Sequence, residues 1–408
     1  MTFTLLGLFY LSRVNLFGWH WAFWVLAAYG VVVTPYLIFR LVVTYLYQPM
    51  GDLGYRPFVS VVVPVYNEEG GIGAAIDSIF GSDYPKDRLE LVVIDDKSTD
   101  GTLEVVRRKR LECDFKLVEL ERNMGKRHAM AAGFRECSGE VLVCIDSDTV
   151  VKPDAIKLLV QPFVDEGVFC VCGNAAVANE GMLDNLLARL QRAWYADSFR
   201  LRKGVESLFG MVICCSGVLA AYRRDKVELI VDEWVDERFL GRHFSSGDDR
   251  QLTNRMMRMG GKSVFQSNAL AYTIVPHVVR TFLIQQIRWG RSGFRGMLFA
   301  SRFFYKKGWV QRALFYLTLF MTFVSPVSFL INTVGLALLG QFELMGVYFL
   351  GLFLIAILTA LSTKLLVSYF SFKDIWYRLV FSVVAVGLSF VYLYAWCTIW
   401  KGNVWGTR

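Results

Sequence analysis

The sequence lacks cysteines at the C-x2-C spacing and the cleavage site of a leader. Its eight cysteines include no C-x2-C pair, which argues against a zinc site or a redox pair and predicts reduced, mostly buried thiols in a cytosolic setting. No small-residue cleavage site follows the first apolar run. We therefore interpret that run as a retained membrane anchor, not as a signal peptide.

Charged residues are scarce at both ends of the chain. Hydrophobic residues make up 54% of the 408 positions, which is too many for a soluble enzyme, while the middle is too charged for a membrane bundle. Residues 16–39 contain His20 but no Asp, Glu, Lys or Arg, and they are about as long as a bilayer is thick. Residues 2–11 are too short to cross alone and form either a separate short segment or an interfacial lead-in. Three more apolar runs follow at residues 313–339, 344–361 and 379–400.

Positive charge indicates how these runs cross the membrane. Lys364, Lys373 and Arg378 place the loop after the second C-terminal run in the cytosol, whereas residues 341–343 carry no positive charge and suit an external loop. Three crossings would leave the C-terminus outside. A re-entrant or split third run, or a further short span at residues 365–372, would return it to the cytosol.

The net charge of +8 does not indicate a nucleic-acid partner, because the basic residues gather in one segment before the last apolar runs. Aromatic residues such as Trp289 and Trp309 are interleaved with them. This composition predicts an interfacial helix on an anionic, cytosolic leaflet. The basic residues are Arg280, Arg288, Arg291, Arg295, Arg302, Lys306 and Lys307.

Between the apolar ends, strands alternate with helices. Apolar strands are expected at residues 59–66, 89–96, 116–120 and 140–148, with helices between them. This order predicts a parallel sheet covered by helices, in which ligands bind outside the carboxyl ends of the strands. A less regular, β-rich part runs on to about Thr273 and contains a basic amphipathic stretch. That stretch covers residues 183–203.

Asp146 and Asp148 are separated by one residue at a strand end, so both carboxylates can face one cation. Oxygen ligands of this kind suit Mg²⁺ or Mn²⁺, which also bind substrate phosphates. A D-x-D match alone is common, however. The pair is therefore a candidate metal site that other motifs must support.

Gly247 precedes two adjacent acids and an arginine, Asp248, Asp249 and Arg250. These acids are ordinary choices for the first turn of a helix. They also suit a site in which a carboxylate accepts the proton of a sugar hydroxyl, because the hydroxyl is a poor nucleophile until it loses that proton.

Gln285, Arg288 and Trp289 fall in the basic interfacial helix. An arginine can neutralise a leaving diphosphate, and an indole can stack on a sugar ring or a uracil. The alternative is an arginine that reaches toward the headgroups beside an interfacial tryptophan.

Taken in order, seven motifs resemble the family-2 glycosyltransferases over essentially the whole chain. They are PVYNE at 64–68, IDDKSTDGT at 94–102, NMGKRHAM at 123–130, DSD at 146–148, CSGVLAAYRRD at 215–225, GDDR at 247–250 and QQIRW at 285–289. The last motif resembles the processive, membrane-integrated branch. Within it, FLG at 239–241 and WGTR at 405–408 look most like the hyaluronan synthases. The chitin and chito-oligosaccharide synthases are close relatives that more often show GEDR.

The resemblance implies roles for matching positions. Asp249, flanked by Asp248 and Arg250, would be the general base on the acceptor hydroxyl. Asp148, with Asp146, would hold Mg²⁺ or Mn²⁺. The remaining matches would bind substrate: Tyr66, Glu68, Asp95 and Asp96 around uracil and ribose, Lys126 and Arg127 toward the uridine or diphosphate, Arg288 at the diphosphate, Trp289 and Gln285 at the acceptor site, and Cys215 and Ser216 at the acceptor end.

The resemblance also implies an architecture and a reaction. A GT-A-type domain at residues 51–275 is expected between an N-terminal membrane segment at 1–50 and interface helices at 276–310, C-terminal spans at 311–400 and a tail at 401–408. The reaction would be a single inverting displacement on UDP-sugars, giving hyaluronan from UDP-GlcNAc and UDP-GlcA or chitin from UDP-GlcNAc alone. The expected enzyme is a monomer in the plasma membrane with a cytosolic catalytic domain, a polysaccharide acceptor and no nucleic-acid partner.

Two other functions compete with this interpretation. A glycosyltransferase that acts once on a lipid acceptor would not need QQIRW and three C-terminal spans. A transporter or receptor that only senses nucleotide sugars would not need the intact acidic motifs.

Overall fold

The computed structural model describes residues 20–178, 185–244, 246–338 and 340–402. Its central part is built on an eight-stranded sheet in the order β3-β2-β1-β4-β7-β6-β10-β5. The strands of this sheet are β1 Val59–Val65, β2 Leu89–Asp95, β3 Lys116–Glu119, β4 Val141–Cys144, β5 Val150–Val151, β6 Val168–Val177, β7 Ala220–Arg223 and β10 Lys262–Thr273. A separate small hairpin pairs β8 Arg238–Phe239 with β9 Arg242–His243.

The first half of the sheet is parallel, as the alternation of strands and helices predicts. β1 pairs in parallel with β2 and β4, and β2 pairs in parallel with β3. The second half departs from the expected parallel sheet, because β7 is antiparallel to both β4 and β6. β7 starts at Ala220, beside Cys144 at the carboxyl end of β4. Before β7, Met211 bridges Ser263 near the start of β10, and the chain then enters the sheet at the carboxyl edge, so β7 runs in the opposite direction. The short β5 is also antiparallel, to β10.

Helices cover both faces of this sheet and enclose the core. Every residue of β1 is buried, which is typical of a parallel strand covered on both faces. The helices of the domain are α3 Ile72–Phe80, α4 Thr102–Glu112, α5 Lys126–Glu136, α6 Ala155–Leu159, α9 Arg224–Glu228, α10 Val231–Val235 and α11 Asp248–Arg258. Short 3₁₀ turns occupy Thr44–Leu46, Lys86–Arg88 and Gln161–Val164.

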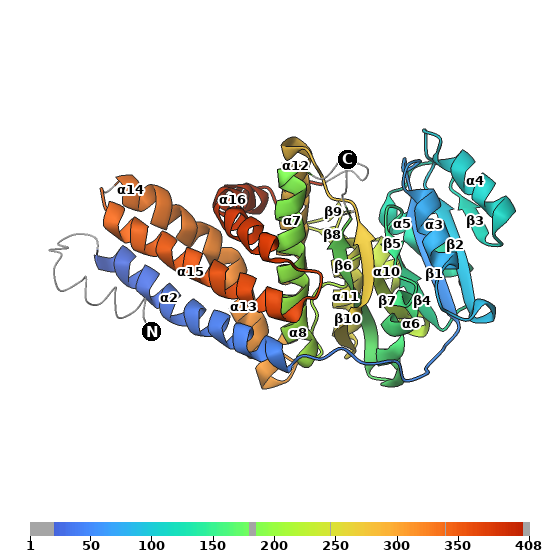
Figure 1. Cartoon of the computed structure of the whole chain (residues 1–408), viewed down its shortest axis with the longest axis horizontal. Helices are drawn as coiled ribbons and strands as arrows, with labels where there is room; N and C mark the ends of the chain where they lie inside the picture. The colour runs from blue at the N-terminus through green and yellow to red at the C-terminus, as the bar shows by residue number, and fades with distance from the viewer. Residues whose placement is uncertain (1–19, 179–184, 245, 339, 403–408) are drawn as a thin grey trace.

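Two amphipathic helices, α7 and α12, stand between the sheet and the long apolar helices (Figure 1). α7 (Leu186–Asp197) continues into a π-helix, Ser198–Lys203, and then α8, Gly204–Leu208. α12 spans Val279–Phe304. The basic composition predicts that the arginines of α12 face a lipid leaflet. Two of them do not, because Arg291 and Arg295 are buried. They donate to Thr398 and to the carbonyl of Ile399, so tertiary contacts use charge that the sequence assigns to the membrane surface.

Four of the described helices are long and apolar enough to cross a membrane. They are α2 (His20–Val43), the segment Trp309–Leu338, α15 (Phe342–Leu366) and α16 (Phe372–Cys397). The second of these consists of α13 Trp309–Leu330, the π-helix Ile331–Gly335 and α14 Leu336–Leu338. The expected feature at residues 2–11 lies outside the described residues. The alternative of a short span at residues 365–372 is wrong, because α15 ends at Leu366 and α16 begins at Phe372.

Both ends of α16 lie against the amphipathic helices. Near its start, Arg378 forms an ion pair with Asp197 of α7 at 2.8 Å. Just past its end, the Thr398 hydroxyl accepts a hydrogen bond from the Arg291 guanidinium of α12 at 3.0 Å. This arrangement favours the re-entrant alternative for the third C-terminal run, since a helix that crosses the bilayer has only one end on each side.

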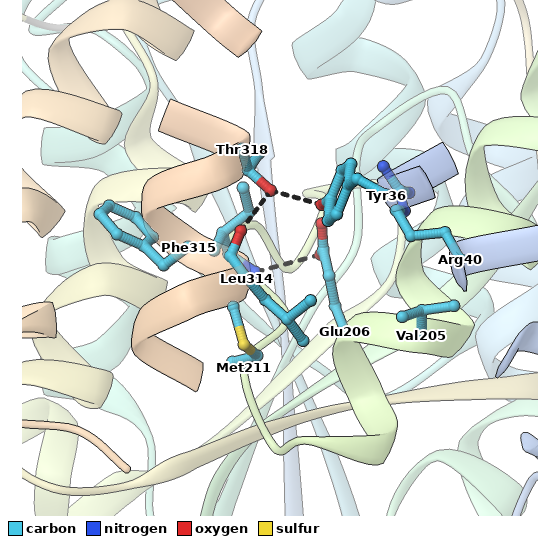
Figure 2. A pocket seen from close by; sticks show the side chains of 9 residues that line it. Tyr36, Arg40, Val205, Glu206, Met211, Leu314, Phe315 and Thr318 are labelled. Carbon is cyan, nitrogen blue, oxygen red and sulfur yellow. Dashed lines mark hydrogen bonds between the residues drawn. The ribbon is translucent and has the colours of Figure 1, made fainter. Parts of the chain in front are cut away.

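The membrane helices also meet the domain at a small pocket, shown in Figure 2. Tyr36 of α2 shares a hydrogen bond with Thr318 of α13 at 2.7 Å, and the backbone amide of Ile213 donates to Glu206 at 3.3 Å. The cavity between these groups is about 10 Å³. It therefore has room for about one water molecule but not for a sugar.

Candidate active site

A single large cavity of about 800 Å³ opens where the carboxyl ends of β1 and β4 meet the amphipathic helices. Ligands bind at this edge in sheets of this kind. Thirteen of the sequence-predicted positions line the cavity: Tyr66, Glu68, Lys126, Asp146, Asp148, Ser216, Asp248, Asp249, Arg250, Gln285, Arg288, Trp289 and the turn residue Gly247. The fold therefore brings together motifs that lie more than 200 positions apart in the chain.

Asp249 lies in the first turn of α11, where its surroundings suit a base. Its carboxylate accepts hydrogen bonds from the backbone amide of Arg250 at 2.7 Å and from the Cys214 thiol at 3.4 Å. Burial raises the pKa of Asp249, and the neighbouring Asp248 raises it further. Burial also raises the pKa of Cys214 to about 12, so its thiol stays protonated and can donate. A carboxylate with a raised pKa holds an abstracted proton more tightly.

Lys126, at the start of α5, balances the negative charge of the cavity. Its ammonium forms an ion pair with Asp146 and lies 3.5 Å from Asp248. Burial would lower the pKa of Lys126, but Asp146 and Asp248 raise it overall. Lys126 therefore stays charged in the wall of the cavity. A Cβ at Gly217 would lie 3.0 Å from the Lys126 ammonium, so a glycine keeps this place open.

Asp146 and Asp148 suit a divalent cation that takes its other ligands from substrate and water. Asp146 and Asp148 both line the cavity, and Asp148 also accepts a hydrogen bond from Thr273 at 3.3 Å. Among the described residues there is no group of three or more His, Cys, Asp or Glu that could hold a metal ion. Two carboxylates still fit Mg²⁺ or Mn²⁺, because these ions take most of their other ligands from water and substrate phosphates.

The QQIRW motif forms the opposite wall on α12. The Trp289 ring lies 6.3 Å from Trp194 and 6.4 Å from Tyr195 of α7, between ring centroids. Arg288 lines the cavity and has no ion-pair partner in the part of the chain that the structure describes. Gln286 is buried, and its carbonyl oxygen accepts from Tyr392 of α16 at 3.1 Å. This wall combines an unpaired cation with flat aromatic surfaces that can pack against sugar rings.

Four predicted positions do not line the cavity, and their binding roles stay predictions. Arg127 is fully buried and pairs with Glu237 at 2.7 Å, so it holds α5 against the β8–β9 region and is not directed to a diphosphate. Cys215 is buried and contacts Ser263, and Cys214 takes the place beside the base. Asp95 and Asp96 accept hydrogen bonds from backbone amides of the adjoining loops, at Ser98 and Met124. Each of the four makes a polar contact within the frame around the cavity.

The structure adds wall residues that the motifs do not contain. They come from the basic amphipathic stretch, which the sequence identifies without assigning it to the site, and from the membrane helices α13 and α16. These residues are Trp194, Tyr195, Ser198, Phe199, Arg202, Lys203, Thr318, Met321, Thr322, Ser325, Ser389 and Tyr392. Hydroxyls at Thr318, Thr322 and Ser325 on one face of an apolar helix are the signal that points to them.

Comparison with curated proteins gives relatives of two kinds. The chain is 34% identical over 272 residues to a hyaluronan synthase from Streptococcus pyogenes, covering 65% of this chain and 64% of that protein. It is 34% identical over 257 residues to an N-acetylglucosaminyltransferase from Sinorhizobium fredii, covering 62% of each. The matched region therefore spans less than two thirds of the length of these relatives.

A solved structure shares the fold. A mannosyltransferase from Pyrobaculum calidifontis, in complex with GDP-Man and Mn²⁺, superposes with a TM-score of 0.61 at 20% identity, covering 92% of this chain and 96% of that one. The sequence matches the family described as glycosyl transferase family 2 over residues 60–231, which carry β1 to β7 and the D-x-D pair. Residues 60–231 are therefore similar to glycosyl transferase family 2, and the superposition shows a shared fold.

Proposed function

We propose that this protein is a processive, inverting polysaccharide synthase that makes hyaluronan from UDP-GlcNAc and UDP-GlcA and passes it across the membrane. The observation that carries the proposal is the continuity of one cavity. Its wall begins at Tyr66 and Glu68 beside the sheet and ends at Ser325 and Ser389 in helices long enough to cross a bilayer. A product that leaves Asp249 on this path enters the membrane segment of the same chain.

The acidic end of the cavity would hold the donor. Tyr66 and Glu68 follow β1, where a nucleoside suits the mixed aromatic and acidic lining. A divalent cation bound at Asp146 and Asp148 would neutralise charge on the diphosphate. Lys126 and Arg288 stabilise the negative charge that develops on the departing UDP, because both are cations fixed in the wall of a partly enclosed cavity.

The acceptor hydroxyl would approach from the aromatic wall. Trp289 and Trp194 orient its sugar ring, and Asp249 removes the hydroxyl proton as the oxygen attacks the anomeric carbon. The bond to UDP breaks on the opposite side, so an α-linked donor gives a β-linked product. Asp249, a single carboxylate with a raised pKa, supports a one-step displacement, because such a reaction needs a base but no nucleophile from the protein.

One chain supplies every wall of this cavity, so we propose that a monomer is active. We also propose that the domain faces the cytosol of a plasma membrane, where UDP-sugars are available. The charges flanking α15 and α16 support this side, since Lys364, Lys373 and Arg378 lie in or beside the loop nearest α7.

A chito-oligosaccharide or chitin synthase that uses UDP-GlcNAc alone is the second candidate. The similarity to the Sinorhizobium fredii N-acetylglucosaminyltransferase favours it, because its identity of 34% equals that to the hyaluronan synthase.

Radiolabelled donor incorporation separates the two candidates. Purified full-length protein is incubated with UDP-[³H]GlcNAc and Mg²⁺ or Mn²⁺, with and without UDP-GlcA. We expect long labelled product only with both donors, and we expect hyaluronidase to digest it. Product from UDP-GlcNAc alone that chitinase cleaves would replace hyaluronan with the second candidate, and label transferred once to lipid would reject processive synthesis.

A further inference from the structure

Lys203 is a buried cation without a compensating anion in the wall of the large cavity. It is the last residue of the π-helix Ser198–Lys203, and it is 3% exposed. Its ammonium donates to the Cys172 thiol at 3.0 Å and lies 3.9 Å from the centroid of the Phe199 ring. No carboxylate lies within ion-pair distance of it among the described residues. The mechanism proposed above does not use this group.

The two contacts of Lys203 bring no negative charge. Burial raises the pKa of Cys172 well above its ordinary value, so the thiol is neutral and cannot act as a counter-ion. The Phe199 ring offers only the weak attraction of a cation to an aromatic face. A buried ammonium without an anion is costly. Because this one lines the cavity, an anion that enters the cavity can remove that cost.

The contacts of Lys203 place it on the acceptor wall. Phe199 lies 5.9 Å from Tyr195 in a stacked arrangement, and Tyr195 lies 6.4 Å from Trp289, between ring centroids. A chain of neighbouring side chains thus connects Lys203 to the tryptophan proposed to orient the acceptor. The proposed diphosphate end is formed by other residues: Lys126 pairs with Asp146, whereas Lys203 contacts Cys172 and Phe199.

We propose that Lys203 binds the carboxylate of a uronic acid residue in the growing polymer and so selects an acidic acceptor chain. Arg202 precedes it, lines the same cavity and is held only loosely by Glu206 at 3.8 Å, so it adds positive charge to this subsite. In an alternating polymer every second sugar carries a carboxylate, whereas chitin carries none. The inference rests on the proposed function, because it names the chemical class of the acceptor at that site.

The test compares two ligands that differ only in charge. Binding of a hyaluronan octasaccharide and of its carboxyl-reduced, neutral derivative is measured by calorimetry on the full-length protein in detergent micelles. We expect Lys203→Met to weaken binding of the acidic octasaccharide roughly tenfold to a hundredfold, the usual range for a lost hydrogen bond to a charged group. Binding of the neutral derivative should stay within about twofold of the wild-type value, and Lys203→Arg should retain most of the acidic affinity.

Controls distinguish this role from others. Lys226→Met removes a cation on α9 that does not line the cavity and should change neither affinity. UDP binding should be unchanged in Lys203→Met. Equal losses for both octasaccharides would show a structural role, and weaker UDP binding would show a diphosphate role; either result overturns the inference. If Lys203→Met does not fold, Lys203→Arg and Lys203→Gln are compared in the same way, and equal acidic affinities would reject it.

A failure of the inference can be distinguished from a failure of the proposed function. Wild-type protein that polymerises UDP-GlcNAc alone refutes the proposed function and the acidic acceptor together. Wild-type protein that makes hyaluronan, with Lys203→Met retaining full affinity for the acidic octasaccharide, refutes the inference alone.

Discussion

At the scale of single residues, the candidate site depends on how one carboxylate is surrounded. Asp249 has a charged neighbour in Asp248, a thiol donor in Cys214 and a backbone donor in Arg250. Burial raises the pKa of Asp249, Asp248 raises it further, and the hydrogen bonds fix the orientation of the carboxylate. Such an environment is more informative than the acidic motif itself, since adjacent acids at a helix start are common.

Asp249→Asn should separate donor binding from elongation. The amide keeps the size of the side chain but cannot accept the acceptor proton. We expect UDP affinity within about twofold of the wild type and a loss of elongation of about 10² to 10⁴-fold, the usual worth of a general base. Filter binding of UDP and polymer assays measure the two effects. Asp232→Asn, at an exposed carboxylate on α10, is the matched control. Full polymer synthesis by Asp249→Asn would reject the assigned base.

The pH dependence of the elongation rate should reveal the effect of Asp248 on the pKa of Asp249. Asp249 acts when it is deprotonated, so activity is present above its raised pKa and is lost as the pH falls through it. In Asp248→Asn the neighbouring negative charge is gone, and the pKa of Asp249 falls. We expect the acidic side of the pH–rate profile for elongation to move to lower pH in this variant, even if its maximal rate also changes. An acidic side that stays in place or moves upward would contradict the assigned coupling.

At the scale of elements, α11 and α12 are held together by small residues at their crossing. Gly247, before α11, has a φ of +87°, and a Cβ there would lie 2.0 Å from the Ser292 hydroxyl of α12. A Cβ at Gly296 would lie 2.2 Å from Arg250. The base and the QQIRW motif can therefore share one wall only because two glycines let these helices approach closely.

Gly247→Ala should loosen this crossing more than a comparable change elsewhere. Gly241 is a matched control, because its φ is +77° and nothing lies within 4 Å of an added Cβ. Both alanine variants carry backbone strain of about 1–3 kcal/mol, but only Gly247→Ala also meets Ser292. We expect a larger drop in Tm and in elongation rate for Gly247→Ala, partly restored by Ser292→Gly. Equal effects at the two glycines would show that the close approach does not matter.

At the scale of the whole molecule, the membrane helices and the domain share a cavity wall. α16 lies along α7 and α12, and the ring of Phe381 stacks on Trp194 at 5.2 Å between centroids. Trp194 also neighbours Trp289. A shift of α16 would therefore reach this wall of the cavity directly through the packed rings.

The position of α16 predicts the side on which its end lies. Because Arg378 and Thr398 both contact the amphipathic helices, we expect Lys401 to be on the side of the catalytic domain. In a Cys397→Ser, Cys113→Ser background, Lys401→Cys should react with a membrane-impermeant maleimide in inside-out vesicles and not in sealed spheroplasts. The same background without Lys401→Cys is the control. Labelling in spheroplasts alone would require α16 to cross the bilayer.

The sequence by itself determined the local parts of this protein. Strand and helix alternation from Val59 to Cys144, the acidic strand end at Asp146 and the apolar helices all follow from short-range periodicity and residue type. The similarity to family 2 followed from motif order. These features depend on neighbours within a few positions, which is why they can be read along the chain.

Only the tertiary structure decided which side chains face the cavity. Arg127 and Asp96 carry charge in matching motifs but satisfy buried partners, whereas Lys203 lies in a stretch with no motif and lines the wall. Likewise, α16 has the composition of a crossing helix, yet both its ends lie beside α7 and α12. Charge and hydropathy state what a residue can do in water or lipid. The partner it meets, and hence its role, is set by contacts between parts of the chain that are far apart in the sequence.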